Sequence, residues 1–140
     1  MSQALVVACS RHVQLDELHE MTKSHFGAQV HAYEDEFQVR VCDGYVRISL
    51  LGDDAEVAED YAANEDLDAA FRAEARDKTY VYVVFNDFEL VKSVMAVLLR
   101  GLGDELPSCW IDTDYGWVMR GAAFLQHLEQ DIEWDWRHKA

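Results

Sequence analysis

Residues 79–85, TYVYVVF, constrain the fold more than any other part of the chain. Valine and aromatic residues favour strands, and seven residues is an ordinary strand length. Alternate side chains of a strand point to opposite faces of a sheet, and here both sets are apolar or aromatic apart from Thr79. Both faces should therefore be covered by other elements, which predicts the central strand of a sheet that carries helices.

The N-terminal part of the chain predicts a strand followed by a helix. Residues 4–10, ALVVACS, form a short valine-rich run typical of a buried strand. Residues 14–26 follow, with Leu15, Leu18 and Met21 at near-helical spacing, and Gly27 is suited to end that helix.

A further helix should follow the central strand. Asn86 is a typical N-cap residue, and Glu89 three positions later completes the pattern of a capping box. The amphipathic run after it reaches Arg100, and Gly101 is the expected stop. This helix should form a right-handed crossover between two parallel strands.

Residues 29–51 alternate in polarity and predict a hairpin whose two-residue loop is Asp43-Gly44. That loop would place Arg40 directly opposite Arg47, a pairing of like charges that is destabilising unless an anion lies between them. The neutralising group could be Glu34, Glu36 or another carboxylate of the chain. The alternative is a bound anion or an acidic partner side chain, which makes Arg40 and Arg47 a possible anion site.

A second hairpin is expected around Asp114, Tyr115 and Gly116, followed by a final helix from about Gly121. Phe124, Leu128 and Ile132 lie on one stripe of that helix. The chain thus predicts one α+β domain over residues 1–140, a mixed sheet with two hairpins and about four helices packed on it.

The segment from residue 52 to 68 holds eight acidic residues and no basic one. We interpret it as a solvated loop leading into a helix over residues 65–76, whose N-terminus its acids would favour. A dedicated docking surface is the alternative interpretation. This possible second acidic patch comprises Asp53, Asp54, Glu56, Glu59 and Asp60.

The chain has 27 acidic and 12 basic residues, and its net charge is about −15. Such a field repels nucleic acid and anionic membranes and attracts a basic protein, although mimicry of DNA is a further possibility. Cys9, Cys42 and Cys109 are odd in number and lie in strand-like stretches, which indicates buried thiols in a reducing cytoplasm. The N-terminus lacks the pattern of a signal peptide.

No complete catalytic or metal motif occurs in the sequence. Asp112, Asp114 and Gly116 superficially resemble a calcium loop, but positions six and twelve of that loop fall on Trp117 and Ala123. We therefore expect no metal, no cofactor and no enzymatic activity. A small-anion-binding domain or an unfamiliar enzyme that uses Arg40 and Arg47 is the alternative.

The ending DIEWDW, residues 131–136, places two tryptophans between carboxylates. Trp136 should close the core, whereas Trp134 could join Trp117 and Tyr115 in an aromatic surface that binds basic side chains. Alternatively, the tryptophans pack the terminal helix onto the second hairpin. The candidate partner-binding residues are Asp112, Asp114, Tyr115, Trp117, Asp131, Glu133, Trp134 and Asp135.

WIDTDYGWVM, followed by FLQHLEQDI and EWDWR, resembles the C-terminal part of some small bacterial immunity proteins. The resemblance covers the last 30 to 35 residues or so and carries over no individual site residue. It implies an acidic, single-domain, cytoplasmic and non-catalytic protein that blocks a basic toxin domain, often a nuclease. We therefore expect a binding protein for a basic partner, and we expect a DNA-mimic inhibitor of a nucleic-acid-binding enzyme as the alternative.

Overall fold

The computed structural model describes residues 3–51 and 54–138. Its strands are β1 (Gln3–Ser10), β2 (Val30–Ala32), β3 (Glu36–Val41), β4 (Gly44–Leu50), β5 (Lys78–Phe85), β6 (Trp110–Asp112) and β7 (Val118–Arg120). Its α-helices are α1 (Leu15–Phe26), α2 (Asp54–Ala63), α3 (Ala69–Glu74), α4 (Phe88–Leu102) and α5 (Gly121–Gln130). Short 3-10 turns extend α1, α3 and α4.

The seven strands form one sheet in the order β2-β3-β4-β5-β1-β6-β7, which confirms the α+β class and the central place of β5. All neighbouring strands are antiparallel, so the prediction of a mixed sheet is wrong. The connection through α4 does join two strands of the same direction, β5 and β6. However, β1 lies between them and pairs with both, so these parallel strands never touch.

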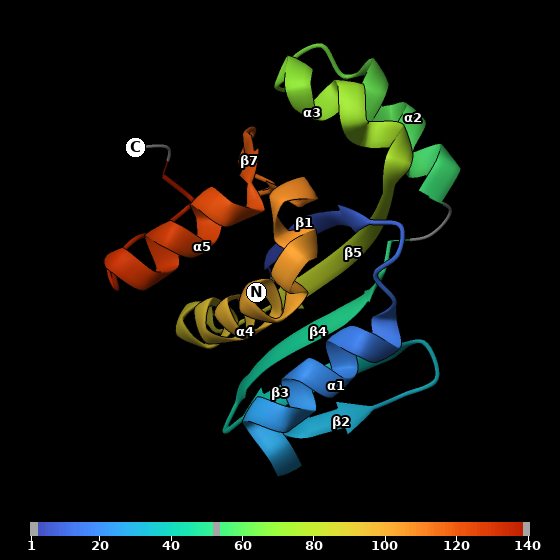
Figure 1. Cartoon of the computed structure of the whole chain (residues 1–140). Helices are drawn as coiled ribbons and strands as arrows, with labels where there is room; N and C mark the ends of the chain where they lie inside the picture. Colours follow the sequence, from blue (N-terminus) through green and yellow to red (C-terminus); the bar gives the residue numbers. More distant parts are fainter. Residues whose placement is uncertain (1–2, 52–53, 139–140) are drawn as a thin grey trace.

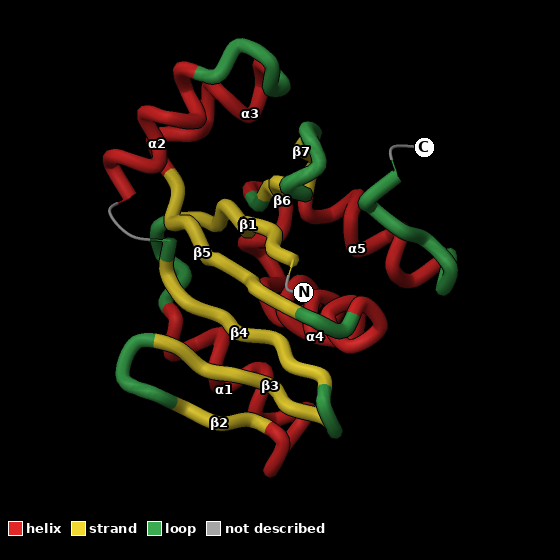
Figure 2. The backbone as a smooth tube through the Cα atoms, turned by 180° about the vertical axis from the view of Figure 1, so that it is seen from behind, coloured by secondary structure: helices red, strands yellow, loops and turns green. Residues whose placement is uncertain are grey.

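The helices form layers on the two faces of the sheet (Figure 1). Leu5, Val7 and Cys9 of β1 face the main core, to which α1, α4 and α5 contribute, whereas Val6 and Ala8 face a smaller core built with α2 and α3. From behind, β2, β3 and β4 stand in front of α1 and α4 without a helix before them (Figure 2). The second face is thus covered only in part. On β5 itself Tyr80 is buried in the smaller core, whereas Tyr82 and Val84 of that face are half-buried, so the expected cover of β5 on both faces is incomplete.

The first hairpin exists, but its loop lies one residue earlier than predicted, which shifts the pairing of the two strands by two residues. Val41 pairs with Gly44, so Cys42 and Asp43 form the loop, and Cys42 is exposed with a φ of 55°. Arg47 consequently faces Gln38 and not Arg40. A Cβ atom at Gly44 would lie 2.6 Å from Asp87 Oδ2, so glycine serves here for close approach and not for the turn.

Asp87, and not Asn86 as predicted, caps the N-terminus of α4. Asp87 is the N-cap of α4, and its Oδ1 accepts from the backbone N–H of Leu90 at 3.0 Å. Asn86 instead braces the first hairpin, because its Oδ1 accepts from the N–H of Tyr45 at 2.7 Å. The helix continues past Arg100 to Leu102 and ends at Gly103, whose φ is 54°.

The acidic segment contains a helix, α2, that the loop interpretation missed. Helix α2 buries Ala58 and packs Val57 and Tyr61 on the smaller core, while its acids lie on other sides. The predicted helix over 65–76 begins later, at Ala69 after the N-cap Asp68. The described residues therefore hold five α-helices instead of about four.

The C-terminal tail, residues 131–138, leaves the helical path that its apolar stripe predicts. Helix α5 ends at Gln130, and Ile132 is 81% exposed. Trp136 is fully buried, as expected, and its ring contacts those of Phe88 and Phe124 at centroid distances of 4.5 and 5.0 Å. The tail thus returns along α5 and closes one end of the main core.

Candidate protein-binding surface

The aromatic surface predicted around DIEWDW does not form. Trp134 is only 8% exposed, because its ring stacks on His127 with centroids 4.6 Å apart and meets the edge of Phe124. The alternative, in which the tryptophans pack the terminal helix onto the second hairpin, predicts their burial but not their partners. The ring contacts of Trp134 and Trp136 are with α5, with each other and with the Phe85–Phe88 region. Tyr115, at 44% exposed, is the large aromatic of this set that solvent reaches.

The carboxylates of that predicted surface fall into separate groups. Asp131 and Glu133 are exposed on a turn that is fixed to α4, since Lys92 Nζ donates to the carbonyl of Ile132 at 2.5 Å. Asp135 forms an ion pair with Arg137 at 2.6 Å, and this hydrogen bonding lowers the pKa of Asp135. Asp135 is thus already neutralised by a neighbour.

Asp112 and Asp114 form the other group of carboxylates, which lies on the β6–β7 hairpin beside α2. The Tyr61 hydroxyl donates to Asp112 Oδ2 at 2.7 Å, and burial together with Asp112 raises the pKa of Tyr61. Burial and the Asp112 charge also raise the pKa of Asp114. Trp117 is half-buried against the main core. This hairpin is therefore an acidic edge with one exposed tyrosine.

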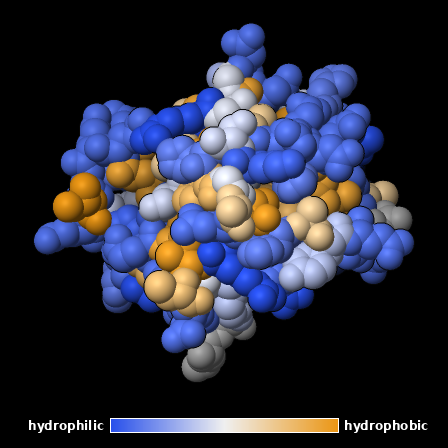
Figure 3. Space-filling view, turned by 90° about the horizontal axis from the view of Figure 1, so that it is seen from below, coloured by the Kyte–Doolittle hydropathy of each residue, from blue (hydrophilic) through white to orange (hydrophobic). Residues whose placement is uncertain are grey.

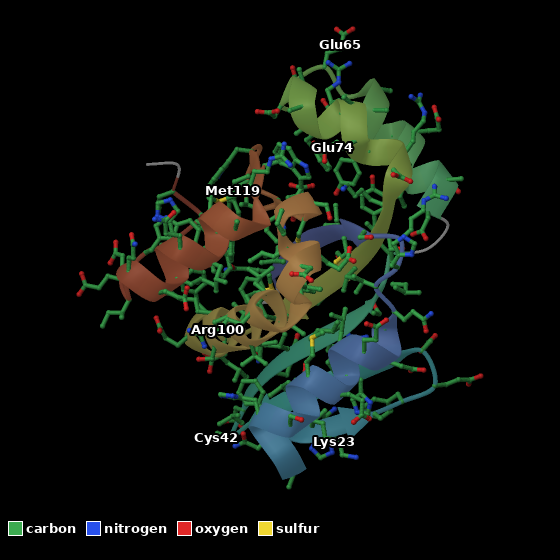
Figure 4. All side chains as sticks on the ribbon, in the orientation of Figure 1. Lys23, Cys42, Glu65, Glu74, Arg100 and Met119 are labelled. Atoms are coloured by element: carbon green, nitrogen blue, oxygen red, sulfur yellow. The ribbon has the colours of Figure 1, made fainter. Side chains whose placement is uncertain are left out.

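The second acidic patch is partly committed to structure. Glu59 forms a bidentate ion pair with Arg76 at 2.6 and 3.1 Å, and Asp54 Oδ1 accepts from the N–H of Tyr80 at 3.4 Å. Asp60 is exposed, and Glu56 lies on the same helix, while Asp53 is outside the described residues. Figure 4 shows Glu65 of the following loop at the opposite end of the molecule from Lys23 of α1 and Cys42.

The two arginines of the possible anion site have partners within the chain. Arg47 makes a bidentate ion pair with Glu36, with Nε–Oε2 and Nη2–Oε1 distances of 3.2 and 3.3 Å, and this bond lowers the pKa of Glu36. Arg40 Nε donates to Gln38 Oε1 at 2.9 Å. Glu36 thus supplies a negative charge near these arginines. Because both arginines already have partners within the chain, they are less available to bind an external anion.

A different surface, which the sequence did not indicate as a site, combines a hollow, carboxylates and apolar side chains. Two adjoining hollows of about 460 and 110 Å³ lie where the N-terminus of α1 meets the β2–β3 loop and the end of β4. We call this surface the acidic groove. Its carboxylates are Asp16, Glu34, Asp35 and Glu36, and its main apolar side chains are Leu15, Tyr33 and Leu50.

The acidic groove is unusual in both its exposure and its charge. Tyr33 and Leu50 are 51% and 47% exposed, among the few large apolar side chains of the described chain that solvent reaches so freely. Asp16, Glu34 and Asp35 are exposed and appear in no ion pair among the described residues. Seen from the α1 and β2 side of the molecule, apolar groups stand between hydrophilic ones (Figure 3).

The sequence carries only a faint signal for this groove. Residues 33–36, YEDE, could have been read as a tyrosine within a charged turn, but their neighbour Asp16 is distant in the sequence. The contacts of α1 with β2 and β3 bring these parts together, and only the tertiary structure supplies them. From the sequence, the apolar residues Leu15 and Leu50 are ordinary core candidates, but in the fold Leu50, the last residue of β4, is exposed.

Among residues 3–51 and 54–138, no three His, Cys, Asp or Glu side chains are grouped so that they could hold a metal ion. None of the described helices combines the length and the apolar character needed to cross a membrane. These features define a seven-stranded antiparallel α+β protein with an acidic surface. Comparison with protein-family models, with curated proteins and with solved structures finds no match for this chain.

Proposed function

We propose that this chain is a non-catalytic binding protein that captures a basic protein, and that the acidic groove is its docking surface. The observation that carries the proposal is the combination of three unpaired carboxylates with the exposed Tyr33 and Leu50 in two adjoining hollows. Lysine and arginine side chains have apolar stems and cationic heads, so such a surface complements both parts. The most specific form of the proposal is a toxin domain, a nuclease in particular, neutralised in the cytoplasm.

The charge balance of the whole chain supports attraction of a cationic partner. The seven ion pairs of the described residues engage six carboxylates, because Glu74 takes two cations. Ion pairing within the chain leaves the net charge of about −15 unchanged, and this charge produces a long-range negative field. Such a field accelerates encounter with a basic protein, whereas buried apolar contacts slow dissociation.

The β6–β7 edge with Asp112, Asp114 and Tyr115 is a secondary contact region in this proposal. Its Asp112 is engaged by Tyr61, and its aromatic content is reduced to Tyr115 and part of Trp117. We therefore assign the anchoring contacts to the acidic groove and assign long-range attraction to this edge and to α2.

The experiment starts with capture of partners from the native host with the full chain, followed by measurement of the rates with the purified partner. Raising salt from about 0.05 to 0.5 M should slow association about tenfold or more and change dissociation little. A basic partner with salt-independent association would contradict electrostatic capture. A partner that is a nucleic-acid-binding enzyme, released by DNA, would favour the DNA-mimic alternative.

Two triple variants with equal loss of charge test the groove itself. The groove variant is Asp16→Asn, Glu34→Gln, Asp35→Asn, and the control variant is Glu65→Gln, Asp66→Asn, Asp104→Asn, whose sites are exposed elsewhere. The groove variant should weaken affinity at least about tenfold more than the control does. Equal weakening by both would show that only net charge acts and would remove the groove from the proposal.

A further inference from the structure

Cys9 of β1 lies opposite Cys109, the residue directly before β6. The β1–β6 ladder pairs Val7 with Ile111 and Ala8 with Trp110, so the next antiparallel step brings Cys9 to Cys109. Both side chains belong to the main core, and they are 1% and 0% exposed. Two of the three cysteines, a hundred residues apart in the sequence, are thus neighbours in the main core.

The backbone groups of Cys9 point away from Cys109. The carbonyl of Tyr80 accepts from the N–H of Leu51, so the polar groups of Tyr80 face β4 and those of the preceding Thr79 face β1. Thr79 is the partner of Cys9 in the β1–β5 ladder. The N–H and C=O of Cys9 are therefore directed to β5 and leave its β6 side without a hydrogen bond.

The backbone groups of Cys109 are likewise used elsewhere. Its carbonyl accepts from the N–H of Gly121 at 2.7 Å, and its N–H donates to the carbonyl of Leu106 at 3.0 Å. The two cysteines therefore form a non-hydrogen-bonded antiparallel pair, the type with the closer Cα atoms, about 4.5 Å apart. This separation lies within the range of roughly 4.4 to 6.8 Å that a disulfide spans.

We propose that Cys9 and Cys109 are a redox modification site that forms an intramolecular disulfide between β1 and β6. The oxidant is a low-molecular-weight disulfide. One cysteine thiolate attacks it, forms a mixed disulfide and releases one small thiol. The other cysteine then attacks the mixed disulfide and releases the second small thiol, so two electrons and two protons pass from the cysteine pair to the oxidant. This site is independent of the proposed binding function.

The surroundings of the two cysteines determine how fast the disulfide forms. Hydrogen bonding with Cys9 and burial raise the pKa of the Cys109 thiol, so the reactive thiolate is scarce at neutral pH. Reaction requires a local opening of the core and should accelerate with pH. Cys42 is exposed in the hairpin turn and should react first, as a simple adduct.

The disulfide would have a distinct structural effect. It would close a covalent loop from residue 9 to residue 109, which restricts the unfolded chain. The sulfur of Cys109 also lies under the first residue of α5, since a Cβ atom added at Gly121 would be 2.9 Å from it. Disulfide formation would therefore alter packing where β6, β7 and α5 meet, at the base of the β6–β7 hairpin.

The test uses the full chain with Cys42→Ser, incubated with excess oxidised glutathione at mildly alkaline pH. We expect a product lighter by two hydrogen atoms, with no thiol titratable after denaturation and with an unfolding midpoint in denaturant that is higher than that of the reduced form. A reductant should reverse all three changes. Cys42→Ser combined with Cys109→Ala is the matched control and should gain neither the mass change nor the stabilisation.

Two results would overturn the proposal. One is that the Cys42→Ser chain keeps both thiols after an incubation over which a small alkylating reagent, in a parallel sample, modifies Cys9 and Cys109 completely. The other is a product that carries glutathione, or a disulfide that lowers the unfolding midpoint. If this control variant fails to fold, Cys42→Ser combined with Cys9→Ala provides the same comparison. The mass and thiol measurements on the Cys42→Ser chain do not depend on either control.

Discussion

Gly44 is so close to Asp87 that one added methyl group should disturb both the first hairpin and the start of α4. Its built Cβ would lie 2.6 Å from Asp87 Oδ2 and 2.9 Å from Asp87 Cβ. Gly44→Ala must displace the Asp87 cap or distort the turn, so we expect the free energy of unfolding to fall by about 1–3 kcal/mol. Denaturant titration of the purified variant measures this loss.

Gly101→Ala is the control for this substitution. A Cβ atom there would meet the thioether of Met21 at 2.5 Å, a flexible group that can turn away, and alanine favours the helix. The free energy of unfolding should change by less than about 1 kcal/mol. Equal losses at Gly44 and Gly101 would show that the contact with Asp87 is not special.

At the residue scale, sequence patterns located the first hairpin but misplaced its loop by one position. Asp-Gly is a strong turn signal, yet here the reason for glycine is a side chain 43 residues away in the sequence, Asp87. A second contact with this hairpin explains the misplaced cap, because the side chain of Asn86 accepts from the N–H of Tyr45. Glu36, one of the carboxylates expected to neutralise the arginines, does pair with Arg47, although Arg40 does not stand opposite Arg47 as that prediction assumed.

The C-terminal tail depends on Trp136 as a structural element. Trp136 is fully buried among Phe85, Phe88 and Phe124, so Trp136→Ala should reduce the free energy of unfolding by about 3–5 kcal/mol. Ile132→Ala, at an 81% exposed position, should change it by less than about 0.5 kcal/mol. A large loss at Ile132, measured by the same denaturant titration, would instead support a continuous helix.

Two aspartates explain why helical periodicity failed in this element. The side chain of Asp131 accepts from the N–H of Glu133, and that of Asp135 accepts from the N–H of Arg137, both near 3 Å. Such local bonds compete with helix formation and produce turns. The pattern of apolar residues thus predicted the packing of Trp136 correctly, while the buried Trp134 and the exposed Ile132 required the tertiary structure.

The whole molecule should be more stable when its charge is screened. With a net charge of about −15, self-repulsion opposes the compact state. Raising NaCl from about 0.01 to 0.15 M should increase stability by about 1 kcal/mol, or roughly 2–6 °C in melting temperature. KCl should act equally, as screening requires. A lower melting temperature in salt would mean that the ion pairs outweigh the repulsion.

At this scale the class of fold followed from local patterns, and the order of strands did not. The apolar stretch of β5 predicted its central place, but nothing in β1 specifies that it pairs with both β5 and β6. The acidic groove is equally non-local, since Asp16 and Glu34 meet through the packing of α1 on β2 and β3. The acidic composition is evident from the sequence, whereas the clustering of carboxylates beside Tyr33 and Leu50 is evident only from the structure.

The position of β1 also matters during synthesis. β1 is synthesised before both of its neighbours, β5 and β6, which end only at Phe85 and Asp112. Until then the valine-rich segment has two unpaired edges, and β2, β3 and β4 cannot cover it. The nascent chain therefore carries a valine-rich segment without its strand partners until β6 has been synthesised, and such an unpaired segment is prone to aggregate with other chains.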